Sequence, residues 1–202
     1  MNAPTDKSEL RREARKRRRN IPESVRAQAQ HDIAGWIEER VARCGWRYIA
    51  AYAGAASEVR LDPWFDQVGS DIELSLPAID SQGVMTFRRW SPGEPLVTGP
   101  FSIEQPKPEA AAIALASQDV VLLPLLGFDH CGLRLGSGAG YYDRAFAFRR
   151  ANDCSPQLIG VAFAVQEFDR LPRDAWDVTL DAVVTERGWI DFQRTSQRNS
   201  IR

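Results

Sequence analysis

The chain has 202 residues, of which 44% are hydrophobic and 26% charged, and its formal net charge is −1, which is ordinary for a globular protein with one substantial core. No apolar run approaches the ~20 residues that a membrane-spanning helix needs, and the charged N-terminus has no apolar region of a secretory signal. We therefore expect one cytoplasmic domain over residues 1–202, with flexible ends at 1–6 and 192–202.

The first predicted element is a helix over residues 8–19 with a strongly basic second half. Residues 11–19 have the sequence RREARKRRR, and the rest of the chain is correspondingly acidic. Three roles are open. The segment could bind nucleic-acid phosphates, it could be a solvated face with Glu9 and Glu13 as opposite charges nearby, or it could lie over a nucleotide and contribute Lys7 and Arg11. The third role fits the rest of the sequence best.

Helices and strands then alternate. Pro22 can open a helix that Gly45 ends. Apolar residues recur in it at roughly helical spacing, namely Val25, Ala29, Ile33, Trp36, Ile37 and Val41. A short buried strand is predicted over residues 48–53, a helix start at 62–65 and a second strand over 71–77.

The second half of the chain continues this alternation. A strand over residues 85–90 leads into a stretch with five prolines, which predicts an extended loop. Further helices are predicted over 109–115 and 141–150, and further strands over 120–124, 158–164 and 177–184. The pattern indicates an α/β domain with three α/β/α layers and a mainly parallel, Rossmann-like sheet.

Ligands of such sheets collect at the carboxyl ends of the strands. Glu58, a glycine-rich loop after residue 124 and Gln166 all follow predicted strands. These three parts of the chain are therefore expected to converge on one cleft.

The glycine-rich loop is the most specific feature. An apolar run ends at Pro124, and before the next helix comes a loop that contains Gly132, Gly136, Gly138 and Gly140. Glycines let backbone approach an anion closely, and free N–H groups at a helix start favour negative charge. Arg134 adds a cationic fork, and Asp143 offers a carboxylate to a metal ion. The loop matches neither a Walker A motif nor GxGxxG, and a set of plain tight turns is the alternative.

Cysteine and histidine exclude other kinds of site. Cys44, Cys131 and Cys154 form neither a disulfide framework nor a CxxC zinc pattern, and two histidines exclude a histidine-rich metal centre. The adjacent His130 and Cys131 could form a nucleophilic pair, but neighbouring loop side chains usually point apart, so we do not favour it.

Residues 128–144, FDHCGLRLGSGAGYYDR, closely resemble the signature FDxxGxRLGxGxGYYDR of 5-formyltetrahydrofolate cyclo-ligases, also called 5,10-methenyltetrahydrofolate synthetases. The resemblance covers nearly the whole chain, through the segments KSELR, SEV, LPAID, MTFRRW, FSIEQPKP, LIGVAFAVQEF and LPRDAWDVTLDAVVTE. Two departures stand out. Ser137 and Ala139 replace the Arg and Lys of many members, and Ser102 replaces a frequent Gly. They bear on phosphate affinity more than on reaction type.

The resemblance implies a ligase of one-carbon metabolism that converts 5-formyltetrahydrofolate to 5,10-methenyltetrahydrofolate, with ATP and Mg²⁺, releasing ADP and phosphate. The formyl oxygen is phosphorylated to make it a leaving group, and N10 then closes the ring. Alignment lowers much of such a barrier, and phosphoryl transfer depends mainly on position and charge compensation. We expect a monomer without membrane or nucleic-acid partners.

The resemblance also implies roles for individual residues. The expected ATP-binding residues are Lys7, Arg11, Arg134, Leu135, Gly136, Ser137, Gly138, Ala139, Gly140, Tyr141 and Tyr142. Asp143 and Asp177 are expected to bind Mg²⁺, directly or through water. Alternatively, Asp143 is only a helix N-terminal charge, and Asp177 is a surface residue at the end of a strand.

Glu58 is expected to recognise the folate, since a carboxylate can accept two N–H bonds from the amino-pyrimidinone edge of a pterin. Tyr141 and Tyr142 could stack or hydrogen-bond beside the formyl group, and Phe101 could flank the ring system. Core packing is the alternative for these aromatic residues. Arg134 and Tyr141 are the expected catalytic residues.

Two other classes of function remain open. A repurposed relative could bind nucleotide or folate without this activity, which Ser137 and Ala139 favour slightly. A nucleic-acid-binding protein could use the basic helix, but no aromatic-basic interleaving or known nucleic-acid motif supports this.

Overall fold

The computed structural model describes residues 6–55, 57–100, 103–150 and 156–192. Eight strands form the main sheet of this part, namely β1 (Tyr48–Ala50), β2 (Glu73–Ile79), β3 (Met85–Arg89), β6 (Ala112–Ile113), β7 (Val120–Pro124), β10 (Gln157–Val161), β11 (Ala182–Thr185) and β12 (Gly188–Asp191). Their order is β12-β11-β10-β7-β1-β2-β3-β6. The central strands β11, β10, β7, β1 and β2 are parallel, while β12, β3 and β6 pair antiparallel at the edges. The predicted α/β class is confirmed.

Helices and two small ribbons complete the described fold. The helices are α1 (Lys7–Arg19), α2 (Glu23–Cys44), α3 (Asp62–Phe65) and α4 (Tyr141–Ala145), with the 3₁₀ turns η2 (Leu115–Ser117), η3 (Ala147–Arg150) and η4 (Ala164–Gln166). Strand β4 (Val97–Thr98) pairs with β5 (Glu104–Gln105), and β8 (Gly127–Phe128) pairs with β9 (Arg134–Leu135). None of the helices in the described ranges has the length and apolar character needed to cross a membrane.

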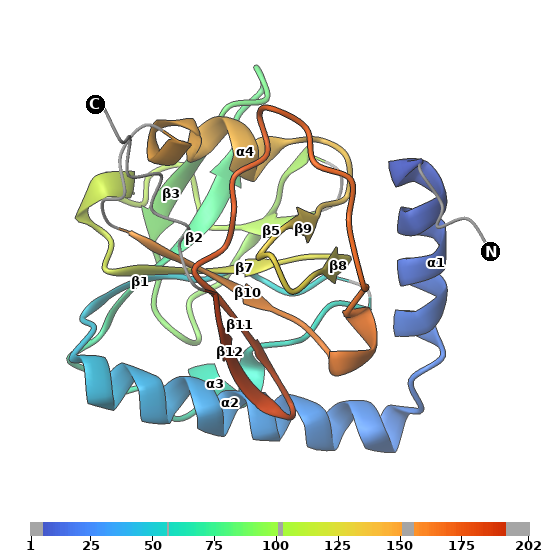
Figure 1. The fold of residues 1–202 in the computed structure, drawn as a ribbon. Helices are drawn as coiled ribbons and strands as arrows, with labels where there is room; N and C mark the ends of the chain where they lie inside the picture. The colour runs from blue at the N-terminus through green and yellow to red at the C-terminus, as the bar shows by residue number, and fades with distance from the viewer. Residues whose placement is uncertain (1–5, 56, 101–102, 151–155, 193–202) are drawn as a thin grey trace, which may run out of the picture.

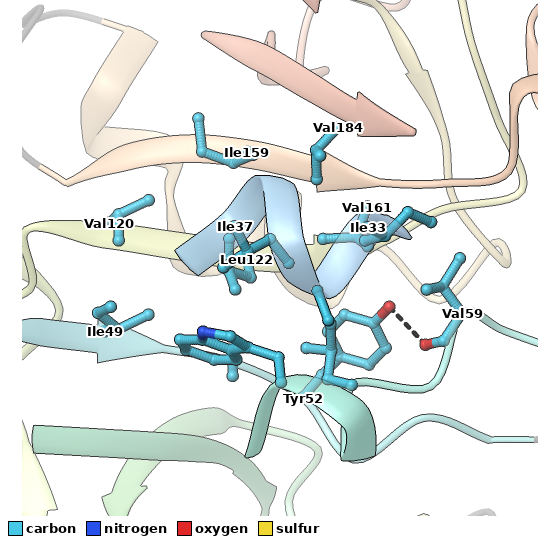
Figure 2. Close-up of a cluster of buried hydrophobic side chains, with 14 of the residues drawn as sticks. Ile33, Ile37, Ile49, Tyr52, Val59, Val120, Leu122, Ile159, Val161 and Val184 are labelled. Atoms are coloured by element: carbon cyan, nitrogen blue, oxygen red, sulfur yellow. Dashed lines mark hydrogen bonds between the residues drawn. The ribbon is translucent and has the colours of Figure 1, made fainter. Parts of the chain in front are cut away.

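The central strand β7 has an apolar core on each side. Successive side chains of a strand point to opposite faces, so Val120 and Leu122 belong to one buried cluster while Val121 and Leu123 belong to another. Helices α2 and α3 cover the first face, where Ile33 of α2 packs over the strands (Figure 2). Helix α4 covers the opposite face (Figure 1), together with Phe146 and with Val178 and Leu180 of the segment before β11. The continuous apolar sequence VVLL follows from burial on both faces.

Helix α2 follows its predicted course with two exceptions. It begins after Pro22 and ends at Gly45, which has a φ of 67° and donates its N–H to the Val41 carbonyl. Val25 and Trp36 were expected on the apolar face but are 55% and 37% exposed. Val25 lies in the first turn, and Trp36 points around the helix toward the β11–β12 turn, where its indole N–H meets the Glu186 carbonyl.

Several other element predictions are wrong in bounds or type. The helix predicted over 109–115 is replaced by β6 and η2, because pairing with β3 overrides local helix propensity. The helix predicted over 141–150 is divided into α4 and η3, and the strand predicted over 177–184 begins only at Ala182. Strand β12 was not predicted. Of the ends expected to be flexible, only Asp6 and Phe192 lie within the described residues.

Helix α1 belongs to neither face of the sheet. Its N-cap is Asp6, whose carboxylate accepts the Ser8 N–H at 2.9 Å. Leu10 and Ala14 pack in a separate apolar cluster with residues of the β8–β9 ribbon and of the segment around Leu171. The helix therefore stands at the carboxyl ends of the central strands (Figure 1), where ligands of parallel sheets bind.

Candidate active site

A pocket of about 480 Å³ lies between α1, the glycine loop, α4 and the ends of β1, β2 and β7. The predicted site residues that line it are Lys7, Arg11, Glu58, Arg134, Leu135, Gly136, Ser137, Gly138, Ala139, Gly140, Tyr141, Tyr142, Asp143 and Asp177. Phe101 and Ser102 lie outside the described residues. The structure thus brings together side chains that are up to 170 positions apart in sequence.

Gln166 does not line the pocket, contrary to the prediction. It is 1% exposed, and its amide donates to the carbonyls of Leu125, at 2.7 Å, and Leu126, at 3.2 Å. The residue instead satisfies backbone acceptors where the chain leaves β7, so its contribution to the site is indirect.

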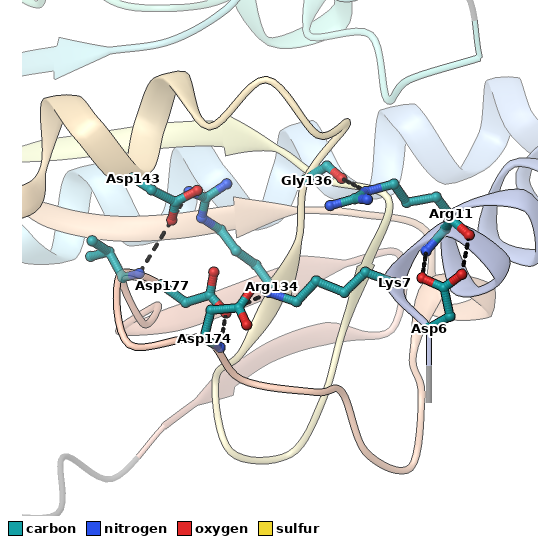
Figure 3. Close-up of polar contacts among 10 residues, drawn as sticks. Asp6, Lys7, Arg11, Arg134, Gly136, Asp143, Asp174 and Asp177 are labelled. Atoms are coloured by element: carbon teal, nitrogen blue, oxygen red, sulfur yellow. Dashed lines mark hydrogen bonds and ion pairs between the residues drawn. The ribbon is translucent and has the colours of Figure 1, made fainter. Parts of the chain in front are cut away.

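Lys7, at the start of α1, is held by two carboxylates. Its Nζ lies 2.7 Å from Oδ2 of Asp174 and 2.7 Å from Oδ2 of Asp177 (Figure 3). Burial alone would lower the pKa of Lys7, but the hydrogen bonds and charges of the two aspartates outweigh it and raise the pKa. Lys7 is therefore a fixed cation at this end of the pocket. Asp177 lies in a loop before β11, not in the predicted strand.

A second ion pair joins the β8–β9 ribbon to α4. Nη2 of Arg134 lies 2.6 Å from Oδ1 of Asp143, which also accepts the Val178 N–H at 3.2 Å. The Arg134 side chain is 5% exposed, and its guanidinium lies 5.6 Å from the ring centroid of Tyr142. This pair fixes the entry of α4 against the loop that carries Asp177.

The glycine loop packs against the arginines of α1. Gly138 and Gly140 have φ values of 116° and 66°, which favour glycine. Nε of Arg11 donates to the Gly136 carbonyl at 3.0 Å, and Nη2 of Arg15 to the Ser137 carbonyl at 3.4 Å (Figure 3 shows the first). Since α4 has only five residues, its dipole is smaller than the predicted ten-residue helix would give. Arginines of α1 bring positive charge to the loop from one side, and Arg144 of α4 donates to the Ala139 carbonyl at 2.7 Å.

Glu58 lies at another part of the pocket in largely apolar surroundings. Its Oε2 accepts the Ala55 N–H at 3.1 Å, and its Oε1 lies 4.0 Å from Nη1 of Arg18. Burial raises the pKa of Glu58, and the Ala55 hydrogen bond and the Arg18 charge oppose that rise. The nearby apolar lining consists of Pro77, Ile79, Met85 and Ile103. Burial also raises the pKa of Tyr142, so its phenol stays protonated.

The donor set fits magnesium as a companion of a nucleotide. Mg²⁺ prefers oxygen ligands and is usually held by one or two carboxylates together with phosphates and waters. Asp143 uses Oδ1 and Asp177 uses Oδ2 in the contacts above, and the other oxygen of each accepts no hydrogen bond from the described residues. Groups of three or more ionisable ligands are absent from the described ranges. Two carboxylates would leave most of the coordination sphere of Mg²⁺ to phosphate oxygens and waters, as is usual for an ion bound together with a nucleotide.

Five polar or aromatic lining residues were not predicted: Arg15, Arg18, Tyr52, Asp174 and Trp176. The arginines could have been found, because positions 7, 11, 15 and 18 share one face of a helix. Asp174 comes three residues before Asp177, but sequence alone did not show that the intervening chain turns back on itself. No sequence signal placed Trp176 at the pocket.

Comparison with known proteins gives consistent results. Residues 3–186 match the model of the 5-formyltetrahydrofolate cyclo-ligase family. The 5-formyltetrahydrofolate cyclo-ligase of Mycolicibacterium smegmatis is 30% identical over 191 residues, covering 92% of this chain and 96% of the relative. That of Escherichia coli is 31% identical over 141 residues, covering 68% and 76%.

Solved structures agree. The NMR structure of Aquifex aeolicus 5,10-methenyltetrahydrofolate synthetase superimposes with a TM-score of 0.80 and 31% identity, covering 93% of each chain. The Mycoplasma pneumoniae 5,10-methenyltetrahydrofolate synthetase gives a TM-score of 0.69 and 25% identity, covering 90% of this chain and 99% of the other.

Proposed function

The chain belongs to the 5-formyltetrahydrofolate cyclo-ligase family and is a ligase of that family, and we propose that its pocket uses ATP to convert 5-formyltetrahydrofolate to 5,10-methenyltetrahydrofolate. The observation that best supports this is one continuous pocket lined by Lys7, the glycine loop, Arg134 and Glu58. Cations and loop backbone suit a triphosphate, while the carboxylate with its apolar surroundings suits a pterin.

The reaction requires that a formamide oxygen become a leaving group. Transfer of the γ-phosphoryl group of ATP to the formyl oxygen gives ADP and an activated carbon. N10 then attacks that carbon, the carbon–oxygen bond breaks with release of phosphate, and N10 loses its proton. The nitrogen–carbon bond that forms and the carbon–oxygen bond that breaks both belong to the folate. The protein's main task is therefore to align the reactants.

Charge compensation comes from the phosphate end of the pocket. We assign Lys7, Arg11 and Arg134 to the triphosphate, because phosphoryl transfer is accelerated chiefly by positioned positive charge. Asp143 and Asp177 would hold Mg²⁺, which supplies further neutralisation of phosphate charge when bound. Lys7 is paired with Asp177, and Arg134 is paired with Asp143. Each pair would therefore offer a positive group to a phosphate and a carboxylate to a divalent cation.

Arginines from α1 offset the uncharged glycine loop. Ser137 and Ala139 carry no charge, but Arg11 and Arg15 bring guanidinium groups against the carbonyls of Gly136 and Ser137. The loop is therefore not poor in nearby cations, which weakens the argument for a non-catalytic relative.

Folate orientation is assigned to the other part of the pocket. Glu58 would accept N–H groups of the amino-pyrimidinone edge, and the apolar lining would cover the ring system. Tyr141 and Tyr142, at the start of α4, would lie beside the formyl group, close to Arg134. Histidine is absent from the lining formed by the described residues, so the proposed chemistry relies on charge and position.

The direct test is to follow the absorbance of methenyltetrahydrofolate in purified protein supplied with 5-formyltetrahydrofolate and Mg²⁺, with and without ATP. We expect product only with ATP, together with one ADP for each product molecule. A sample with heat-denatured protein controls for acid-catalysed ring closure. Absence of product, or equal product without ATP, would contradict the proposal.

A further inference from the structure

We propose that Arg18 is a positioning residue for folate recognition, which orients the carboxylate of Glu58 toward the pterin. This inference rests on the proposed function, because it takes Glu58 as the residue that contacts the folate. Arg18 lies in the last turns of α1, eleven residues after Lys7, and it belongs to the same pocket.

The guanidinium of Arg18 joins three parts of the fold. Its Nε donates to Oγ of Ser57 at 2.9 Å, and its Nη1 donates to the Leu125 carbonyl at 3.4 Å. The same Nη1 lies 4.0 Å from Oε1 of Glu58. Arg18 thus connects α1 and the end of β7 to the residue next to Glu58 and to Glu58 itself. A buried arginine, 6% exposed, that makes these contacts is not a solvated charge.

A second arginine holds the same segment from α2. Nη1 of Arg26 donates to the Ser57 carbonyl at 3.0 Å, and its Nη2 donates to the Arg18 carbonyl at 2.6 Å. The backbone before Glu58 is therefore fixed from two helices. Glu58 completes the arrangement by accepting the Ala55 N–H with Oε2.

The 4.0 Å separation is important for the proposed role. It exceeds hydrogen-bonding distance, so Arg18 acts on Oε1 of Glu58 through charge and does not occupy its lone pairs. Oε2 has one N–H partner, which also leaves acceptor capacity. A carboxylate held in this way can still accept two N–H groups from a ligand.

Arg18 is also the cation that faces Glu58 among the described residues. The other ionisable groups near Glu58 are the phenols of Tyr52, which follows β1, and Tyr142 on α4. Burial raises the pKa of both phenols, so neither carries charge near neutral pH. Burial also raises the pKa of Glu58, and Arg18 opposes this. Removing Arg18 should therefore raise the pKa of Glu58 further and reduce its ionised fraction at mildly acidic pH.

The first test measures Glu58 itself and does not depend on turnover. Carboxyl-carbon NMR of glutamate-labelled protein, with Glu58→Gln to assign the signal, would follow the titration of Glu58. We expect its midpoint to move to higher pH in Arg18→Met and by less in Arg18→Lys, which keeps the charge. An unchanged midpoint in Arg18→Met would overturn the inference. Arg18→Gln, which retains hydrogen-bonding capacity without charge, carries the same expectation if the Met variant does not fold.

The matched control is Arg17→Met. Arg17 is the preceding residue of α1, but it contacts Glu13, the Glu167 carbonyl and the Phe168 ring and does not line the pocket. This variant also removes one arginine from the helix, so it corrects for the general loss of positive charge. We expect the Glu58 titration and both Michaelis constants to stay close to wild type.

The second test is kinetic. Arg18→Met should raise the KM for 5-formyltetrahydrofolate by up to about tenfold for each unit that the pKa of Glu58 rises, at pH values below that pKa. The effect should shrink as the pH rises, because Glu58 is then ionised with or without Arg18. The KM for ATP should change less than about twofold, and Arg18→Met should add little in a Glu58→Gln background.

The outcomes separate three possibilities. If Arg18 only anchors α1, Arg18→Met should raise the KM values for 5-formyltetrahydrofolate and ATP together, since Lys7 and Arg11 are on the same helix. Its effect should then add to that of Glu58→Gln and should not depend on pH. Either result would contradict the inference. A wild-type protein that forms no methenyl product would refute the proposed function, whereas the NMR titration would still test the link between Arg18 and Glu58.

Discussion

Replacing Asp129 by Ala should strongly destabilise the protein, although Asp129 does not line the pocket. Its side chain is fully buried. Oδ1 accepts the N–H groups of Cys131 at 2.9 Å and Leu133 at 3.1 Å, and Oδ2 accepts that of Leu171 at 2.9 Å. One carboxylate thus ties the β8–β9 turn, which precedes Arg134, to the segment that precedes Asp174 and Asp177.

The expected magnitude follows from the donors that would be left. A buried donor without an acceptor costs about 1–3 kcal/mol. The N–H groups of Leu133 and Leu171 are in buried surroundings, whereas that of Cys131 is only partly buried and can reach water. We expect Asp129→Ala to lower the free energy of unfolding by about 4 kcal/mol. This is a large part of the roughly 5–15 kcal/mol typical of a domain, and it should lower Tm by roughly 8–16 °C for a chain of this size.

The assay is urea denaturation followed by circular dichroism, with Asp80→Ala as the matched control. Oδ1 of Asp80 also accepts two backbone N–H groups, those of Gln82 and Val84, both at 2.9 Å. Asp80 is exposed, so water can replace it, and its loss should cost only about 0.5–1 kcal/mol. If the two variants lost similar stability at equal m-values, the argument that burial sets the cost of the Asp129 contacts would be refuted.

Three further predictions concern the pocket. Glu58→Gln should raise the KM for 5-formyltetrahydrofolate by at least about tenfold, because a charged hydrogen bond contributes roughly 1.5–3 kcal/mol; an equal rise in the KM for ATP would contradict its role. Arg134→Ala should raise the KM for ATP by a similar factor, whereas Arg149→Ala, which breaks the Arg149–Asp181 pair, should not; unchanged ATP kinetics would remove Arg134 from the site. Activity should disappear in excess chelator and return with Mg²⁺, and full turnover in chelator would exclude the metal role of Asp143 and Asp177.

Sequence patterns predicted the centre of the fold better than its edges. Val120–Pro124 was predicted with the bounds that β7 has, because a strand buried on both faces has a continuous apolar sequence. The edge strand β6 was mistaken for a helix, since two residues paired with β3 leave almost no periodicity to detect. Strand β12 was missed because its burial depends on α2, including the contact between the Trp189 indole and the Trp36 carbonyl, 153 residues apart.

The candidate site shows the same division between local and distant information. The glycine loop and Arg134 were visible in one continuous segment, and the loop geometry depends on the local φ values of its glycines. The pairing of Lys7 with Asp174 and Asp177 depends on the docking of α1 through Leu10 and Ala14, which no local pattern encodes. Sequence could therefore name half of the lining residues, but it could not show which charges are bound to each other.

The arrangement of α1 bears on the nucleic-acid hypothesis. Lys7, Arg11, Arg15 and Arg18 recur every three or four residues, so they face the pocket as a row that extends about 16 Å along the helix. Arg17 is paired with Glu13 on another side. Much of the basic charge is thus directed at the pocket and at neighbouring side chains, and less of it is free to contact a phosphate backbone. The same helix thus carries Lys7 and Arg11, which we propose for the triphosphate, and Arg18, which we propose to position Glu58, so the pocket accounts for the basic sequence better than a nucleic-acid partner does.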